Sequence, residues 1–174
     1  MTIPLADLVA ALRHAGQVHG GPAGLPDIAI EAITCDSRQV TSGSLFVAYP
    51  GVSVDGHDFI PQAVTNGAVA IVSEKRLEGL GVPVVVVPDG REALAYLSAA
   101  WYRFPSRQLT VVGVTGTDGK TTTCNLLHSI LLAAGRRAGL VTTVNAVIGQ
   151  RQMDTGLHTT TPDAPDMQRY LAEM

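Results

Sequence analysis

The sequence predicts an α/β protein made of two successive domains, and three observations support this prediction. Short runs of β-branched residues alternate with stretches in which apolar residues recur at helical spacing. Hydrophobic residues make up 46% of the 174 residues and charged residues 16%, which is enough apolar material for a buried core. The segment Phe-Pro-Ser-Arg-Gln at 104–108 interrupts the alternation. We therefore expect a first domain over residues 1–105 and a second over residues 106–174.

The first domain is expected to begin with a helix at Pro4, because proline is favoured in the first turn of a helix. Four apolar residues at helical spacing would form its buried face: Leu5, Leu8, Val9 and Leu12. Strands are predicted at 30–35, 45–49, 68–72 and 82–87, and the last two are expected to be buried on both faces. Two further helices are predicted at 59–66, which Gly67 would end, and at 91–102, with Leu94, Leu97 and Trp101 on one face.

The second domain is expected to start with a βαβ unit with a right-handed crossover. Its strands would be 109–114 and 139–143, and its helix 120–134, with four residues facing the core: Leu127, Ile130, Leu131 and Ala134. A last helix is predicted at 162–174, with Met167, Tyr170, Leu171 and Met174 on one face. About 69 residues supply too few helices to cover a parallel sheet, so we expect the N-terminal part of a longer polypeptide. The alternative is a small domain whose last helix frays.

Composition and charge argue against several classes of protein. The net charge of −3 is unlike that of a general nucleic-acid binder, which usually carries a basic face. The only cysteines, Cys35 and Cys124, are too few for a disulfide scaffold and lack zinc-ligand spacing. The chain opens without a basic leader and has no run of 18 apolar residues. We therefore expect a cytoplasmic protein without membrane insertion and without a nucleic-acid partner.

The strongest chemical signal is a phosphate loop in the segment Val-Val-Gly-Val-Thr-Gly-Thr-Asp-Gly-Lys-Thr-Thr-Thr at 111–123. A hydrophobic run leads into glycines, then Lys-Thr, then a helical pattern, as in loops whose backbone N–H groups bind phosphates. The strict pattern needs glycine where Val114 stands, so the match is to the shorter form Gly-x-x-Gly-Lys-Thr. The predicted ATP-binding residues are Gly116, Thr117, Asp118, Gly119, Lys120, Thr121 and Thr122. A glycine-rich turn that binds no nucleotide is the alternative.

Two side chains of this loop have chemical roles in the prediction. Lys120 can bridge the β- and γ-phosphates and is the predicted catalytic residue, while the Thr121 hydroxyl is suited to Mg²⁺. We expect Asp118 to weaken ATP binding unless a cation offsets its charge, because a carboxylate beside phosphates is unfavourable.

Several stretches resemble the Mur ligases, which attach amino acids to a UDP-muramoyl precursor of peptidoglycan. The loop at 115–123 is similar to their ATP loop, and Thr34-Cys-Asp-Ser-Arg38 with Gly43-Ser-Leu-Phe-Val-Ala48 to the start of their uridine domain. Asp55-Gly-His-Asp-Phe-Ile60 and residues 63–70 continue that pattern. Thr160-Thr-Pro-Asp-Ala164 resembles the substrate loop of the MurE branch and differs from that of MurF. Asp118 departs from the family, which usually has asparagine there.

The resemblance implies a small N-terminal α/β domain that binds UDP-MurNAc and the start of a P-loop, parallel-sheet ATP-binding domain. The reaction would add diaminopimelate or lysine to UDP-MurNAc-L-Ala-D-Glu through an acyl-phosphate, with ATP and Mg²⁺. Arg38 could also donate charge-assisted hydrogen bonds to a diphosphate. The substrate-binding residues implied are Cys35, Ser37, Arg38, Val52, Ser53, Val54, Thr159, Thr160 and Thr161.

Family members carry a modified lysine, further Mg²⁺ ligands and an amino-acid-selecting domain in sequence that would follow Met174. We therefore expect this chain to be inactive as a ligase by itself. Two alternatives remain open: a MurF-like or other Mur-type ligase acting on a related UDP-sugar acid, and a non-catalytic nucleotide-binding module. His57 is interpreted as a helix-cap or surface residue rather than as a catalytic partner of Asp58, since adjacent residues of an extended chain point apart.

Overall fold

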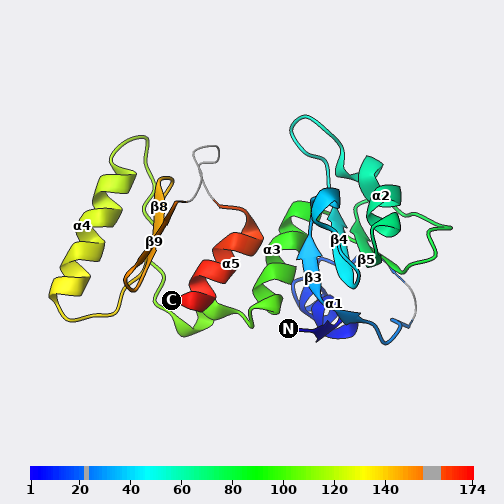
Figure 1. Cartoon of the computed structure of the whole chain (residues 1–174), viewed down its shortest axis with the longest axis horizontal. Helices are drawn as coiled ribbons and strands as arrows, with labels where there is room; N and C mark the ends of the chain where they lie inside the picture. Colours follow the sequence, from blue (N-terminus) through cyan, green and yellow to red (C-terminus); the bar gives the residue numbers. More distant parts are fainter. Residues whose placement is uncertain (22–23, 155–161) are drawn as a thin grey trace. The chain divides into compact units, whose positions relative to one another are not determined.

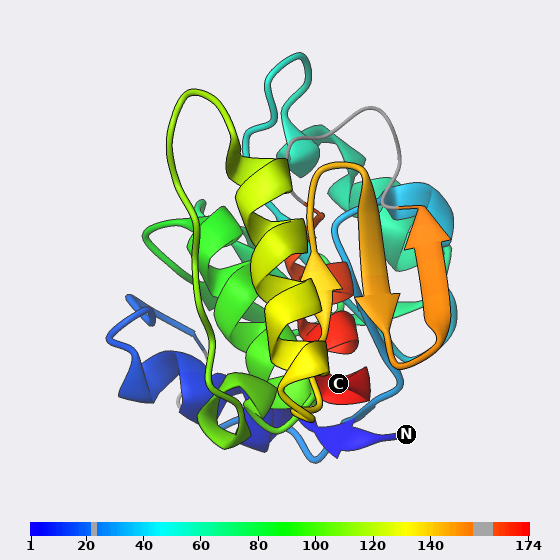
Figure 2. The ribbon, with the colours of Figure 1, turned by 90° about the vertical axis from the view of Figure 1, so that its left-hand side faces the viewer.

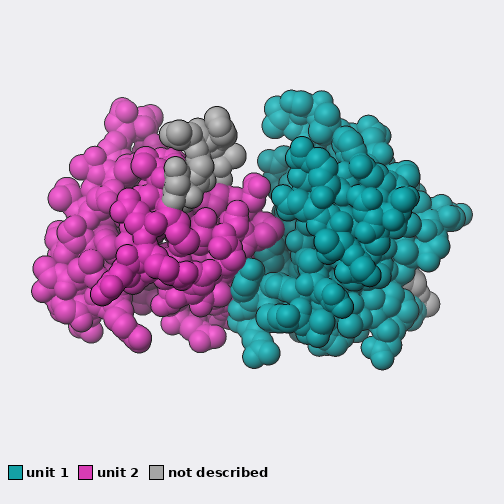
Figure 3. Space-filling view, viewed as in Figure 1, with its two compact units in different colours: residues 1–103 teal, residues 104–174 magenta. Residues whose placement is uncertain are grey.

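A computed structural model describes residues 1–21, 24–154 and 162–174 (Figure 1). The chain forms two compact units, Met1–Arg103 (unit 1) and Phe104–Met174 (unit 2), which are coloured separately in Figure 3. None of the helices within the described ranges is long and apolar enough to cross a bilayer.

Unit 1 is built on a parallel four-stranded sheet, as the α/β prediction required (Figure 1). Its strands, in spatial order, are β3 (Ala32–Thr34), β4 (Ser44–Ala48), β5 (Ala68–Ser73) and β6 (Val84–Val86). All residues of β4 and nearly all of β5 are buried, which is typical of parallel strands that are covered on both faces. The carboxyl ends of the parallel strands share one edge of the sheet, where open α/β sheets place their ligands.

Helices cover both faces of this sheet. The helix α2 (Ile60–Thr65) packs on one face against Phe46, Ala48 and Ile71. On the other side, α3 (Gly90–Trp101) contacts β4 and β5 and packs against α1 (Leu5–His14). The predicted apolar face of α1 is confirmed, because its four leucine and valine residues are buried: Leu5, Leu8, Val9 and Leu12.

Element boundaries in unit 1 differ from the prediction at three places. Pro4 lies in a short strand β1 (Ile3–Pro4), which pairs antiparallel with β2 (Ala29–Ile30), and α1 begins one residue later. The predicted strand 30–35 is therefore divided between β2 and β3. At the division, the Glu31 N–H donates to the Gly43 carbonyl at 2.9 Å, as the chain leaves one partner strand for another. The predicted helix 59–66 is a 3₁₀ turn, η2 (Gly56–Phe59), followed by α2.

Unit 2 contains a small antiparallel sheet between two helices (Figure 2). After a 3₁₀ turn η3 (Pro105–Gln108) and the phosphate loop come α4 (Lys120–Ala133), β7 (Leu140–Val141), β8 (Asn145–Ile148), β9 (Arg151–Asp154) and α5 (Ala164–Glu173). The strand order is β7-β8-β9. Figures 1 and 2 together show α4 and α5 on opposite faces of this sheet. Tyr170 of α5 packs against Ala146 and Ile148 and is buried, so the predicted core face of the last helix is confirmed at this residue.

The predicted βαβ unit of the second domain is wrong for the described residues. Residues 109–114 form no strand, and Val111 and Val112 are 60% and 61% exposed. Of the predicted strand 139–143, only β7 forms, and it pairs antiparallel with β8. A strand forms where a neighbouring strand accepts its backbone hydrogen bonds. The hairpin β8–β9 supplies such a partner for β7, and no described segment supplies one for 109–114.

The predicted core face of the helix after the phosphate loop is also wrong in part. No residue of α4 is buried, although Leu127 and Leu131 are partly covered. Ile130 is 64% exposed, and Ala134, just after the helix, is exposed as well. The contacts of α4 with the sheet are concentrated on β7, and much of the apolar surface of the helix stays exposed.

Candidate functional site

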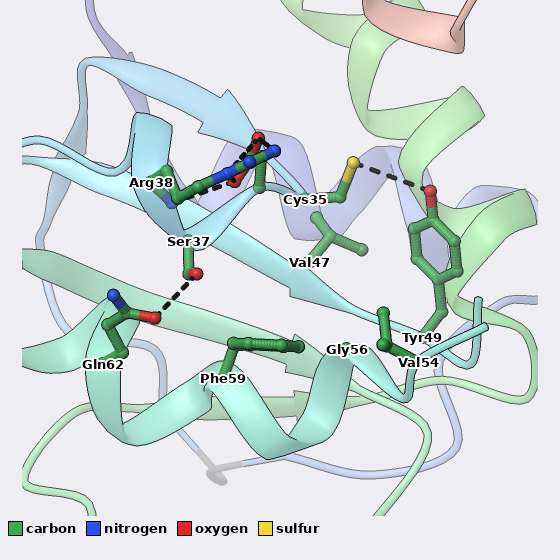
Figure 4. Close-up of a pocket in the computed structure, with 10 residues that line it drawn as sticks. Cys35, Ser37, Arg38, Val47, Tyr49, Val54, Gly56, Phe59 and Gln62 are labelled. Carbon is green, nitrogen blue, oxygen red and sulfur yellow. Dashed lines mark hydrogen bonds and ion pairs between the residues drawn. The ribbon is translucent and has the colours of Figure 1, made fainter.

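A hollow of about 520 Å³, here called the unit 1 pocket, opens where β3 and β4 end (Figure 4). Its walls come from the segment after β3, from β4 and its end, and from the η2–α2 region. The lining residues are Cys35, Asp36, Ser37, Arg38, Val47, Tyr49, Val54, Gly56, Phe59 and Gln62. Its position at the carboxyl edge of a parallel sheet is the one expected of a ligand site in an α/β protein.

The rim of the unit 1 pocket carries an ion pair between two neighbouring residues. Asp36 caps the 3₁₀ turn η1 (Ser37–Gln39) by accepting the Arg38 N–H at 2.9 Å. The Arg38 guanidinium returns to the same carboxylate, with Nε 2.9 Å from Oδ1 and Nη2 2.7 Å from Oδ2. This side-chain hydrogen bond lowers the pKa of Asp36 and raises the pKa of Arg38. The Arg38 side chain is 83% exposed, so its remaining N–H donors are open to an anion.

Ser37 lies below the rim and is tied to α2. Its hydroxyl donates to Oε1 of Gln62 at 3.0 Å (Figure 4). Nδ2 of Asn66 donates to the Ser37 carbonyl at 2.9 Å. Because the Ser37 hydroxyl proton is directed to Gln62, the serine oxygen offers a ligand its lone pairs. Gln62 was not predicted as a site residue. It belongs to no recognisable motif, because it is a single polar residue on the short helix α2, 25 positions after Ser37.

The opposite part of the pocket is aromatic and apolar. The Tyr49 hydroxyl donates to Sγ of Cys35 at 3.5 Å, and Phe59 and Val54 lie across from Ser37 (Figure 4). The structure thus brings Cys35, Ser37, Arg38 and Val54 of the predicted substrate residues around one hollow. Val52 and Ser53, which directly precede Val54, were also predicted but do not line the pocket. Val52 is 99% exposed, and Ser53 is exposed as well. The predicted residues Thr159, Thr160 and Thr161 lie outside the described residues.

His57 differs from its sequence interpretation. The predicted surface role is wrong, because the residue is 7% exposed. Asp58 is not its partner, as expected, since the two ring nitrogens are bonded to Asp55 and to the Glu74 N–H. The imidazole Nδ1 lies 2.5 Å from Oδ1 of Asp55, and Nε2 accepts the Glu74 N–H at 3.2 Å. The other Asp55 oxygen accepts from Nζ of Lys75 at 2.7 Å. The pKa of the Asp55 carboxyl lies well below its ordinary value, first because of this hydrogen bond from Lys75 and then because of the His57 N–H.

Two glycines of the predicted phosphate loop in unit 2 have positive φ angles. Gly116 has φ +150° and Gly119 has φ +76°, values that glycine adopts far more readily than other residues. The helix α4 begins directly after Gly119, at Lys120. The amide N–H groups in the first turn of a helix have no acceptor within the helix, so they point toward the loop and can bind an anion.

Lys120 folds back over this loop. Its Nζ donates to the carbonyls of Gly116, at 2.5 Å, and Thr117, at 3.1 Å. The ammonium therefore lies at the loop, near the exposed amide groups of the first turn. A bound phosphate would compete with these carbonyls for the ammonium.

A second hollow of about 570 Å³, here called the unit 2 pocket, lies at the phosphate loop. It brings together six of the seven predicted ATP residues, and only Gly116 of that set does not line it: Thr117, Asp118, Gly119, Lys120, Thr121 and Thr122. Thr142 and Thr143, which follow β7, line it as well and were not predicted. Their position just beyond the end of a strand is the signal that could have indicated them.

The donor set at the unit 2 pocket fits a magnesium ion that is held mainly by phosphate and water. Within the described part of the chain, no group of three or more His, Cys, Asp or Glu residues could hold a metal. The Thr121 hydroxyl is a hard oxygen donor in the first turn of α4. Magnesium bound to nucleotides usually keeps several waters and takes few protein ligands, so one hydroxyl beside a triphosphate is a suitable contribution.

Two family models match the sequence. The model described as "Mur ligase family, catalytic domain" matches residues 29–102, and the "Mur ligase middle domain" matches residues 114–174. The chain is 48% identical over 157 residues to the UDP-N-acetylmuramoyl-L-alanyl-D-glutamate--2,6-diaminopimelate ligase of Geobacillus thermodenitrificans. That match covers 90% of this chain and 31% of the relative. The chain thus spans about a third of the length of the curated relatives it matches.

Solved structures of Mur ligases also match the chain. A structure of a UDP-N-acetylmuramoyl-L-alanyl-D-glutamate--2,6-diaminopimelate ligase matches 99% of the chain with a TM-score of 0.69 at 25% identity, over 33% of its own length. The MurF ligase of Thermotoga maritima, solved in complex with ADP, matches 79% of the chain with a TM-score of 0.53 at 31% identity, over 29% of its own length.

Proposed function

The chain belongs to the Mur ligase family, and on that premise we propose that it carries the nucleotide-sugar site and the ATP site of a MurE-type ligase. The whole protein would join an amino acid, diaminopimelate or lysine, to UDP-MurNAc-L-Ala-D-Glu. One observation carries the proposal. The unit 1 pocket lies entirely within the segment that matches the first family model, and the unit 2 pocket entirely within the segment that matches the second.

The unit 1 pocket is proposed to bind the UDP part of the precursor. Its apolar side, with Val54 and Phe59, suits a flat nucleobase, and the buried Ser37 offers a polar contact beside it. Arg38 at the exposed rim suits the diphosphate, which would share the guanidinium with Asp36. Thr159, Thr160 and Thr161 remain proposed for the muramoyl end.

The unit 2 pocket is proposed to bind ATP with Mg²⁺. The glycine backbone and the first turn of α4 would bind the phosphates, and Lys120 would exchange its two loop carbonyls for phosphate oxygens. Thr121 would contribute its hydroxyl to Mg²⁺, which neutralises phosphate charge when bound. A cytoplasmic location is proposed with this function, because ATP and a UDP-linked precursor are its substrates.

The proposed chemistry has two steps. The D-glutamyl carboxylate attacks the γ-phosphorus of ATP, forming an acyl-phosphate and releasing ADP. The amine of the incoming amino acid then attacks the acyl carbon, forming the amide and releasing inorganic phosphate. The contribution of this chain is to position both substrates and to stabilise charge on the transferring phosphoryl group through Lys120. We expect no tripeptide from the 174-residue chain alone, because its described residues offer no acidic cluster for further metal ions.

The proposal is tested by calorimetric titration of the chain with UDP-MurNAc-L-Ala-D-Glu in the absence of ATP. We expect binding, and we expect MurNAc-L-Ala-D-Glu without the UDP group to bind far more weakly. GDP serves as a matched control for a diphosphate with a different base. Equal affinity for the precursor with and without UDP would overturn the assignment of the unit 1 pocket.

A further inference from the structure

Residues 54–59 form one wall of the unit 1 pocket, and a buried histidine fastens this segment to the sheet. Val54, Gly56 and Phe59 lie along one side of the pocket, opposite Cys35 and Ser37 (Figure 4). The segment precedes α2 and contains the 3₁₀ turn η2, so regular secondary structure alone holds it weakly. His57, in the middle of it, has a side chain that is 4% exposed.

The hydrogen bonds of His57 define its tautomer. A backbone amide can only donate, so Nε2, which accepts the Glu74 N–H, carries no hydrogen. The proton of the neutral ring is then on Nδ1, from which it is donated to Asp55. Glu74 directly follows β5, and its Oε1 accepts the N–H of Gly90, the first residue of α3. His57 therefore links the pocket wall to the end of β5, and through Glu74 to the start of α3.

Two other contacts hold the same segment in place. Lys75, the residue after Glu74, reaches the second oxygen of Asp55 at 2.7 Å. Gly56 donates its N–H to the Tyr49 carbonyl at 3.0 Å, and a Cβ at Gly56 would lie 2.7 Å from that oxygen. This close approach fixes how far the wall can move toward β4. Without the imidazole, the wall would keep the contact with β4 and lose its only described side-chain bond to the backbone at the end of β5.

We propose that His57 is a positioning residue of the unit 1 pocket: its neutral ring, held between Asp55 and the Glu74 amide, sets the place of Val54 and Phe59 for the nucleotide-sugar ligand. This inference rests on the proposed function for the identity of the ligand. Both ring nitrogens of His57 are already bonded, one to Asp55 and the other to the Glu74 amide, so neither is available to bind the ligand. It acts through the wall on which it lies.

The test uses three substitutions that retain different hydrogen bonds. In His57→Gln the amide oxygen can still accept from Glu74, but the donor to Asp55 is lost. In His57→Asn the shorter amide can still donate to Asp55, but it cannot reach Glu74. His57→Ala loses both bonds. His14→Gln, at an exposed histidine of α1, is the matched control.

Calorimetry of the whole chain with UDP, at a temperature well below all unfolding transitions, gives the first result. We expect His57→Ala to lose at least about fivefold in UDP affinity, and the Gln and Asn variants to lose less, because each keeps one bond. ATP affinity, measured at the other unit, is expected to stay unchanged in all variants. In a Val54→Ala background, the loss caused by His57→Ala is expected to be smaller, because the residue through which His57 acts has been truncated. Additive losses, or unchanged UDP affinity in His57→Ala, would overturn the proposal.

Hydrogen exchange separates this proposal from the proposed function. The amides of Gly51, Gly56 and Glu74 are bonded in or beside this wall, to Val54, Tyr49 and His57 respectively. We expect them to exchange faster in His57→Ala and to keep wild-type rates in His14→Gln, whether or not UDP binds. If wild-type chain fails to bind UDP, the proposed function is wrong and the exchange result alone decides whether His57 orders the wall. Unchanged exchange at Gly51 and Gly56 would contradict the positioning role.

Discussion

Arg38 and Asp36 form a two-pronged ion pair at the rim of the unit 1 pocket, with Nη2 2.7 Å from Oδ2 and Nε 2.9 Å from Oδ1. The pair keeps the guanidinium oriented at the mouth of the pocket while 83% of the arginine side chain is exposed. An exposed ion pair adds little to stability. Its value in the proposed function is therefore to orient a cation toward a diphosphate.

Arg38→Ala should accordingly weaken ligand binding without weakening the fold. We expect a loss of roughly 1.5–3 kcal/mol in binding of UDP-MurNAc-L-Ala-D-Glu, the usual range for a hydrogen bond to a charged group. Uridine, which lacks the diphosphate, should bind the variant and the wild type equally. Calorimetry with both ligands and a thermal melt measure these effects. An equal loss for uridine would show that Arg38 supports the base side of the pocket instead.

The lowered pKa of the Asp55 carboxyl predicts that the folded protein loses stability in acid. Its pKa is lowered in the folded protein, first by the hydrogen bond from Lys75, so folding favours the ionised form. Its contribution is fully present above the unfolded pKa of about 3.9 and is lost as the pH falls toward the folded value. Asp55→Asn should therefore lower the melting temperature by a constant amount between about pH 5 and about pH 7. Below about pH 4 the difference from the wild type should become progressively smaller.

Lys75→Met is the companion variant for this effect, because it removes the first cause of the pKa shift and leaves Asp55 in place. Its melting temperature should fall less steeply than that of the wild type as the solution is acidified. A difference between wild type and Asp55→Asn that persists undiminished in acid would contradict the assignment.

Asp118 adds a negative charge at the phosphate loop, and its removal should favour ATP. We expect Asp118→Asn to tighten ATP binding by about two- to fivefold, the scale of one exposed charge pair. Glu78→Gln, an exposed carboxylate of unit 1, is the charge-matched control and should leave ATP affinity unchanged. If Asp118→Asn weakened ATP binding, Asp118 would instead be holding the metal ion or a basic group.

Gly119 is predicted to be needed for its backbone conformation. No atom lies within 4 Å of a Cβ built there, so the cost of Gly119→Ala comes from its φ of +76° rather than from a clash. The strain is about 1–2 kcal/mol, and its relief would displace the loop and weaken ATP binding. Gly135→Ala is the matched control, with φ +73° and equally open space at the other end of α4. Both variants should lose similar stability, and only Gly119→Ala should lose ATP affinity.

Local patterns in the sequence were sufficient for the helices and for the buried strands of unit 1. The apolar face of α1 and the apolar strands β4 and β5 follow from patterns within a few residues. The phosphate loop was found in the same way, because glycines, lysine and helix start are contiguous. Pairing between distant segments could not be predicted so well. Residues 109–114 have the composition of a strand, but a strand also needs a neighbouring strand to pair with. The sequence does not show that β7 pairs with β8 rather than with residues 109–114.

The same reason explains what was missed at the unit 1 pocket. Cys35, Ser37 and Arg38 lie within four consecutive positions and carry a recognisable motif. The partner of Ser37 is Gln62, and the partner of the His57 ring is the backbone of Glu74, 17 residues away. Such contacts depend on how β4, β5 and α2 pack together, and no local pattern specifies them. Val52 was predicted from resemblance alone, and in this structure its side chain is 99% exposed.

The central claim is that two separate pockets bind two different ligands, and a crossed titration tests it most directly. Ser37→Ala and Lys120→Ala are each titrated by calorimetry with UDP-MurNAc-L-Ala-D-Glu and with ATP and Mg²⁺. We predict that Ser37→Ala loses precursor affinity and keeps ATP affinity, and that Lys120→Ala loses ATP affinity by at least about tenfold and keeps precursor affinity. If each variant affected both ligands equally, or if neither ligand bound the wild-type chain, the account of two sites would be contradicted.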